Sequence, residues 1–271
     1  FTLVELVVAL GVSAVLTVLV IEALVGLAKD RSSREMIIEV QGEARLGLSH
    51  LERDIRTASL GAGTGVIWFQ DPRAGSPTVN TRVGRPALQI YDNLAGGGAI
   101  LNPPAKPNTD ALLVAGALGT AAARAAAVGD QIHPAAPPVQ LPVTSTSGFA
   151  LNGYALFGEY GDAGWARVTG ILAGNVLELS NTVNLYRARD SQLPSGSLVR
   201  PARARLYYVD TSDQLVRLSL AAPVPPTVAA EILDREVLAV AFENLQLDCQ
   251  TDSGGGVLAA CVTQADADAT T

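Results

Sequence analysis

The sequence predicts an α+β protein in which one long N-terminal helix packs on an antiparallel β-sheet domain. Three observations predict this class. Residues 1–28 are almost uniformly apolar, residues 29–60 carry apolar side chains at helical spacing, and the remainder alternates short apolar runs with glycine and proline. With 271 residues, 48% of them hydrophobic, the chain can bury a core. We expect residues 61–271 to form a β-rich head with long loops at 71–147.

Residues 1–28 are long and apolar enough to cross a bilayer. Between Phe1 and Ile21 the only charged residue is Glu5, and the apolar run continues past Glu22 to Ala28, where Lys29 ends it. A transmembrane helix needs about 20 apolar residues. The segment lacks the basic region and the cleavage site of a secretory signal peptide. We therefore predict a helix that lies in a membrane or in the core of a filament.

Glu5 is unusual inside such a helix. A carboxylate in a membrane-spanning helix costs about 2.5–3.5 kcal/mol, so a positive partner is expected. The nearest cation is an α-amino group, and pairing within one chain is geometrically poor because both groups lie in the first turn. We expect Glu5 to pair with the terminal amine of a neighbouring copy. The alternative is an incidental Glu in an ordinary membrane anchor.

Residues 29–60 are predicted to continue the helix with one apolar face. The apolar residues follow one another in steps of three or four: Ile37, Val40, Ala44, Leu48, Leu51, Ile55 and Ala58. This spacing places them on one side of a helix that can lie on a sheet. A coiled coil is disfavoured, because the segment is barely three heptads long. The glycine-rich run 61–65 is expected to end the helix, and it lacks the lysine of a phosphate-binding loop.

Short apolar runs predict the strands of the head. They are residues 66–69, 87–91, 110–115, 154–160, 165–169, 176–179, 203–209, 214–218 and 237–247. The clearest hairpin spans Arg203–Leu220, in which Arg203, Arg205 and Tyr207 share one face. Asp210 and Asp213 bound its turn; we interpret them as turn formers rather than calcium ligands.

Composition excludes several functions. The net charge of −7 argues against nucleic-acid binding, and two Cys with two His exclude a four-ligand Cys/His zinc site. His50 and His133 are expected on the solvated surface, as is the basic cluster of Arg200, Arg203 and Arg205. No nucleophile–base–acid set can be assembled. We predict a protein that is not an enzyme and that uses no cofactor or metal.

The N-terminal residues Phe1-Thr2-Leu3-Val4-Glu5-Leu6, followed by an unbroken apolar helix, resemble mature type IV pilins and type II secretion pseudopilins. This resemblance implies the type IV pilin fold. It also implies that a prepilin peptidase exposes Phe1, that Phe1 is N-methylated, and that Glu5 sets the register between subunits. One departure is Glu22, because many major pilins have a helix-kinking proline near this position.

The head resembles that of PilW-type minor pilins and the related J-type pseudopilins. The similar motifs are the run after Asp110, the hairpin ending in Arg167-Val168-Thr169, and Leu206-Tyr207-Tyr208-Val209. The resemblance implies a minor pilin that primes assembly or joins the pilus tip. It would lie in the inner membrane before assembly and on the cell surface afterwards. Implied partners are other pilins and a tip adhesin. Alternatives are a J-type pseudopilin or a membrane-tethered binding protein.

Cys249 and Cys261 flank an 11-residue segment that contains three consecutive glycines. In an exported chain, two cysteines across a short loop predict a disulfide. A loop of this size gives about 3 kcal/mol of stabilisation on the chain-entropy account. Two free buried thiols are the alternative.

Overall fold

The computed structural model describes residues 3–58, 66–70, 82–91, 100–117, 123–126, 139–159, 162–180, 195–226, 229–242, 245 and 262–263. These residues form one long helix and one large sheet, which confirms the α+β class. The sheet is mixed, however, rather than purely antiparallel. β1 pairs with β8, and β13 with β3, in two short parallel contacts.

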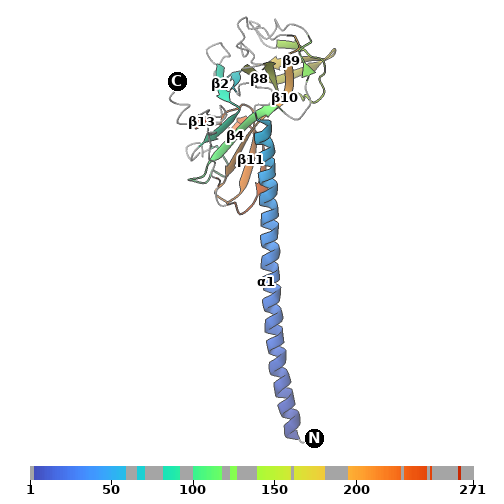
Figure 1. The fold of residues 1–271 in the computed structure, drawn as a ribbon, viewed down its shortest axis with the longest axis vertical. Coiled ribbons are helices and arrows are strands. Elements are labelled where there is room, and N and C mark those ends of the chain that lie inside the picture. Colours follow the sequence, from blue (N-terminus) through green and yellow to red (C-terminus); the bar gives the residue numbers. More distant parts are fainter. Residues whose placement is uncertain are drawn as a thin grey trace, which may run out of the picture.

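The helix α1 (Leu3–Thr57) has 55 residues and is therefore roughly 80 Å long. Its C-terminal third lies against the head, and the remainder projects away from it as a free rod (Figure 1). The helix passes from the predicted apolar segment into the predicted amphipathic segment without a break. Directly after the helix, Ala58 forms an isolated antiparallel bridge with Gly116 of β4 (Ala111–Ala117).

Thirteen strands lie within the described residues. They are β1 (Val66–Gln70), β2 (Arg82–Pro86), β3 (Leu88–Tyr91), β4 (Ala111–Ala117), β5 (Ala123–Arg124), β6 (Val139–Pro142), β7 (Tyr154–Glu159), β8 (Asp162–Leu172), β9 (Val176–Ser180), β10 (Leu198–Val209), β11 (Leu215–Leu220), β12 (Ile232–Ala239) and β13 (Val262–Thr263). A short 3₁₀ helix, Ala229–Glu231, precedes β12.

The 12-residue strand β10 joins two halves of the head. Its N-terminal part pairs with β5 and β7, which belong to the half distant from the helix. Its C-terminal part pairs with β4 on one edge and β11 on the other, beside the helix. Because one continuous strand serves both halves, their positions relative to each other are fixed by backbone hydrogen bonds.

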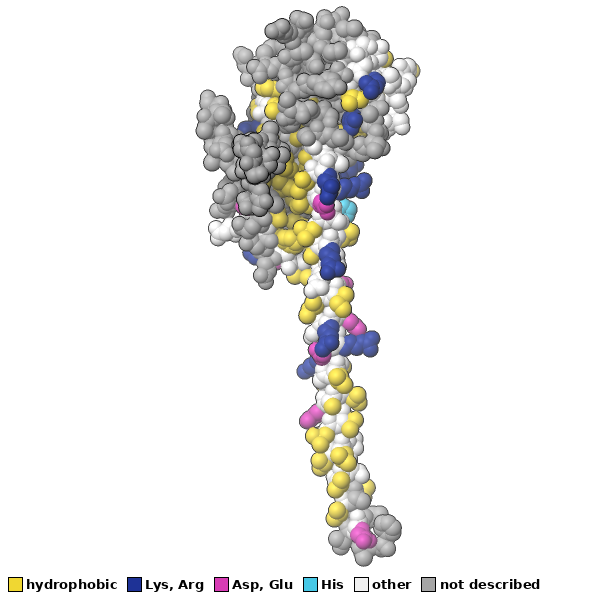
Figure 2. All heavy atoms as spheres, in the orientation of Figure 1, with side chains coloured by type: hydrophobic (Ala, Val, Ile, Leu, Met, Phe, Trp, Pro, Cys, Tyr) yellow, Lys and Arg dark blue, Asp and Glu magenta, His cyan; other side chains and the backbone are white. Residues whose placement is uncertain are grey.

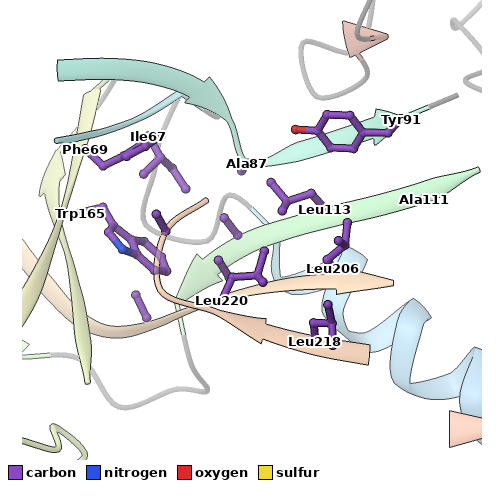
Figure 3. Close-up of a cluster of buried hydrophobic side chains, with 14 of the residues drawn as sticks. Ile67, Phe69, Ala87, Tyr91, Ala111, Leu113, Trp165, Leu206, Leu218 and Leu220 are labelled. Carbon is purple, nitrogen blue, oxygen red and sulfur yellow. The ribbon is translucent and has the colours of Figure 1, made fainter. Parts of the chain in front are cut away.

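The largest hydrophobic cluster lies on the face of β4, β10 and β11 that is opposite the helix. Leu113, Leu206 and Leu218 from these strands belong to one cluster with Phe69 and Trp165, which come from β1 and β8 (Figure 3). A second cluster fills the distant half. A third lies between the sheet and the helix and contains Leu51, Ile90, Leu112, Val114 and Tyr207. β4 is buried along its whole length because clusters cover both of its faces.

Most predicted strands are present, but the sequence did not predict β2, β5, β6 and β13. The strand predicted at 165–169 begins earlier, because Asp162 already pairs with Glu159 and starts β8. The final strand, predicted at 237–247, is only partly right: β12 runs from Ile232 to Ala239, and residues 240–242 are not in a strand.

Candidate functional site

The projecting part of α1 presents a continuous apolar surface. Every described side chain from Leu3 to Glu39 is exposed, and individual leucines and valines reach exposed fractions such as 81% for Leu3 and 66% for Leu27. An 18-residue window of this helix has a mean hydropathy of 2.3, and none of it is buried. Hydrophobic side chains follow the lower half of the rod (Figure 2). By length and composition this helix can cross a membrane. Water alone is an unfavourable environment for it.

Glu5 lies in the first turn of this helix, at the end far from the head, and is exposed. The positive end of the helix dipole favours a carboxylate there. No Lys or Arg precedes Lys29 in the sequence. The only other acid before Lys29 is Glu22, which is also exposed and lies almost five turns further along the helix. Phe1 lies outside the described residues.

A band of charge follows the apolar segment. Arg31 pairs with Glu35, and Arg34 with Asp30, each at 2.9 Å and each across one turn of the helix. Exposed pairs of this kind add little stability. Their position is more informative, because it marks the point at which the helix becomes compatible with water. Figure 2 shows this band of charged side chains between the apolar rod and the head.

Gly47 allows the helix to lie close to the sheet. A Cβ atom at this position would lie 3.2 Å from Leu215 Cδ2, 3.4 Å from Leu238 Cβ and 3.6 Å from Ala239 Cβ. The absence of a side chain therefore brings the helix backbone against β11 and β12. By contrast, a Cβ atom at Gly42, one turn earlier, would meet nothing within 4 Å.

Most of the predicted helix face does contact the head: Leu51 is buried, and Val40, Ala44, Ile55 and Ala58 are half-buried. Two predicted residues differ, because Ile37 and Leu48 are 55% and 44% exposed. Two causes explain the difference. The head begins to cover the helix at Val40, so Ile37 lies beyond its reach, and the close approach at Gly47 turns Leu48 outward.

Asp54 is the polar centre of the junction between helix and sheet. Arg205 Nη1 donates a hydrogen bond to Asp54 Oδ1 at 2.5 Å and also contacts Oδ2, which in addition accepts a hydrogen bond from the Tyr207 hydroxyl. The Arg205 and Asp54 side chains are only 15% and 12% exposed. Burial raises the pKa of Tyr207, and the hydrogen bond to Asp54 and its negative charge raise it further. The phenol is thus held in its neutral, donating form.

The sequence prediction for the basic cluster was right for one residue only. Arg203 is exposed as expected, Arg200 is half-buried, and Arg205 is held by Asp54 rather than by solvent. The sequence contains a signal that could have identified Asp54 as a buried acid, although not Arg205 as its partner. Asp54 falls on the apolar helix face between Leu51 and Ala58, and an acid at such a position implies a buried cation nearby.

Asp210 and Asp213 act as turn formers, as predicted. Asp210 Oδ1 accepts hydrogen bonds from the backbone N–H groups of Ser212 at 2.8 Å and Gln214 at 3.0 Å. Asp213 has a φ of 58° and pairs with Lys106. Within the described residues no group of three or more His, Cys, Asp or Glu side chains is arranged to hold a metal ion.

The remaining candidate residues divide into two groups. His50 was predicted to be on the solvated surface but is half-buried beside the sheet. His133, Cys249, Cys261 and the glycine-rich run 61–65 lie outside the described residues, so the disulfide stays a prediction.

Comparisons of the chain with protein-family models, with curated proteins and with solved structures find no match.

Proposed function

We propose that this chain is a minor pilin, a structural and non-catalytic subunit that primes the assembly of a type IV pilus or joins its tip complex. The observation that carries the proposal is the exposed apolar rod of α1, with a carboxylate in its first turn and a head attached at its other end. The N-terminal resemblance to pilins and the helix-on-sheet arrangement, which fits the type IV pilin fold, support it.

The apolar rod has two successive environments in this proposal. Before assembly it lies in the inner membrane, with the charged band that begins at Lys29 at the bilayer surface. In the filament the same side chains pack against the rods of neighbouring subunits, which removes them from water without lipid. A long, unbroken apolar helix suits both environments, because its backbone hydrogen bonds are satisfied internally.

Glu5 sets the register of assembly. In either environment an unpaired carboxylate is unfavourable by about 2.5–3.5 kcal/mol, and a positive charge nearby offsets that penalty. The terminal amine of processed, N-methylated Phe1 in the adjoining subunit supplies this charge. A subunit that docks one position too high or too low leaves both charges unpaired in an apolar bundle.

A matched pair of substitutions tests the proposal. In the organism that encodes the chain, Glu5→Gln and Glu22→Gln each remove one carboxylate from the same apolar segment. We expect Glu5→Gln to lower the amount of chain in sheared surface filaments at least tenfold. The amide no longer attracts the amine of the adjoining subunit, and a loss of about 1.4 kcal/mol in the free energy of docking lowers the equilibrium constant tenfold. Glu22→Gln should assemble normally. Immunoblots of the sheared and membrane fractions measure both, and mass spectrometry of the sheared fraction reports the methylation of Phe1.

The same fractions separate the alternatives. A J-type pseudopilin would fit the same helix, and deletion of the gene would then abolish protein secretion while leaving pilus-dependent motility intact. A membrane-tethered binding protein would stay in the membrane fraction in every variant. Equal amounts of wild type and Glu5→Gln in the filaments would refute the role of Glu5.

A further inference from the structure

A pocket of about 320 Å³ opens where the C-terminal end of α1 meets β4, β10 and β11. Basic side chains dominate its lining. Those that carry the argument are His50, Arg53 and Asp54 from the helix and Arg203, Arg205 and Arg217 from the sheet. Figure 2 shows part of this region, with basic side chains and a histidine gathered beside the upper helix.

The charges in the pocket do not balance. Asp54 is taken up by Arg205 and Tyr207, and Arg217 pairs with Glu236. Within the part of the chain that the structure describes, the side chains of Arg53 and Arg203 form neither an ion pair nor a hydrogen bond. Two positive charges are therefore left over in one pocket, on a chain whose net charge is −7.

Two further observations indicate that positive charge is in excess in the pocket. Burial lowers the pKa of Arg203, and the neighbouring charges of Arg205 and Arg217 lower it further; Asp54 and Asp234 raise it, but the net direction is down. In addition, Arg205 Nε is buried and finds no hydrogen-bond partner among the residues that the structure describes. Crowded guanidinium groups and an unpaired buried donor are both unfavourable, and a bound anion relieves the electrostatic crowding.

We propose that this pocket binds a small dianion of the phosphate monoester class. Two surplus guanidinium groups match two negative charges. Arginines that reach the pocket from a helix and from a sheet can each donate to a different oxygen of one tetrahedral group, in the planar geometry that suits phosphate. The volume is within the range of small-molecule sites.

The ligand is soluble rather than a headgroup of the bilayer that holds the helix. His50 is 22 residues beyond Ala28, the last residue of the apolar segment, which places the pocket roughly 33 Å along the helix from the membrane surface. Headgroups of that bilayer do not reach so far. The anion site itself depends only on the junction between helix and sheet, whereas the exclusion of a headgroup rests on the proposed position of the apolar segment in a membrane.

Calorimetry on the full chain in detergent, with phenyl phosphate as the probe, tests the proposal. We expect saturable binding with one site per chain, and none for phenol at the same ionic strength. Arg53→Gln and Arg203→Gln should each weaken binding at least tenfold, because each removes a charged hydrogen-bond donor to the phosphate. The matched control is Arg56→Gln, on the same helix, where Arg56 pairs with Glu52 outside the pocket. It should bind within about twofold of wild type.

Three outcomes would overturn the proposal. The first is no saturable binding up to about 10 mM, where even a weak site would be detected. The second is an equal loss of affinity in Arg56→Gln and Arg203→Gln, which would show unspecific attraction. The third concerns the source of the anion. If affinity for phenyl phosphate falls in nanodiscs of phosphatidylglycerol relative to phosphatidylcholine, and Arg203→Gln removes that difference, a lipid headgroup occupies the pocket.

Discussion

Asp54 shows how a single acid can fix the position of a helix on a sheet. Its carboxylate is almost fully removed from water, so it depends on Arg205 and Tyr207 for its hydrogen bonds. A buried ion pair of this kind is not stabilising in itself, because desolvation offsets the attraction. It is specific, however: the carboxylate meets both Arg205 Nη1 and the Tyr207 hydroxyl only when the helix occupies one rotation and one height.

Asp54→Asn is therefore expected to be strongly destabilising. The amide cannot neutralise Arg205, which stays buried, and we expect a loss of about 3 kcal/mol in the free energy of unfolding. Urea denaturation of the full chain in detergent, followed by tryptophan fluorescence, measures this loss. Glu52→Gln is the matched control: it removes an exposed acid paired with Arg56, and should change stability by less than about 0.5 kcal/mol. Similar losses in both variants would contradict a special role for Asp54.

The helix–sheet pair, Asp54 with Arg205, marks the limit of what the sequence reveals at the scale of residues. Asp54 and Arg205 are 151 positions apart, and the residue type and position of Arg205 are those of an ordinary solvent-exposed residue. An acid on a helix and an arginine on a strand are usually solvated. Only the fold brings them together. Asp210, in contrast, was predictable, because its partners lie two and four residues away in the same turn.

At the scale of elements, Gly47 sets the distance between α1 and the strands β11 and β12. We expect Gly47→Leu to push the helix away from Leu238, at a cost of about 1–3 kcal/mol for overpacking. Gly42→Leu introduces the same side chain where nothing lies within 4 Å, and should be neutral or slightly stabilising because leucine favours helix more than glycine does. Thermal unfolding of the two variants under identical conditions measures the difference. A loss in Gly42→Leu as large as that in Gly47→Leu would rule out close approach as the cause.

The elements were predicted best where local periodicity is strong. The helix follows directly from residues 1–60, and the hairpin of β10 and β11 from its alternating faces and its turn. β12 was misplaced because Asp234, Arg235 and Glu236 hide its strand character. Their side chains are exposed on a strand that pairs with β11 alone among the described strands, and charged residues are common on such edges. The parallel contacts of β1 and β13 join distant segments and leave no local pattern.

At the scale of the whole molecule, the chain consists of a rod and a head that share one helix. The described contacts of α1 with the head begin at Val40, and the described side chains before it are all exposed. Because the head is built from its own clusters and from residues 40–58 of the helix, the apolar segment contributes no packing to it. The two parts can therefore serve different environments, one apolar and one aqueous.

This division predicts the behaviour of a chain that lacks residues 1–28. We expect residues 29–271 to remain in solution without detergent and to unfold within about 0.5 kcal/mol of the full chain, as for changes that remove no buried contact. The full chain should float with liposomes in a density gradient, whereas the shortened chain should stay at the bottom, because the apolar side chains that partition into lipid are gone. A longer truncation from the same end, to residues 59–271, supplies the contrast. It removes Leu51 and Asp54 from the junction and leaves Arg205 without its acid, so the head should lose its cooperative unfolding transition. If the chain that begins at residue 29 also lost that transition, the rod would be part of the folded head, and the separation of the two parts would be wrong.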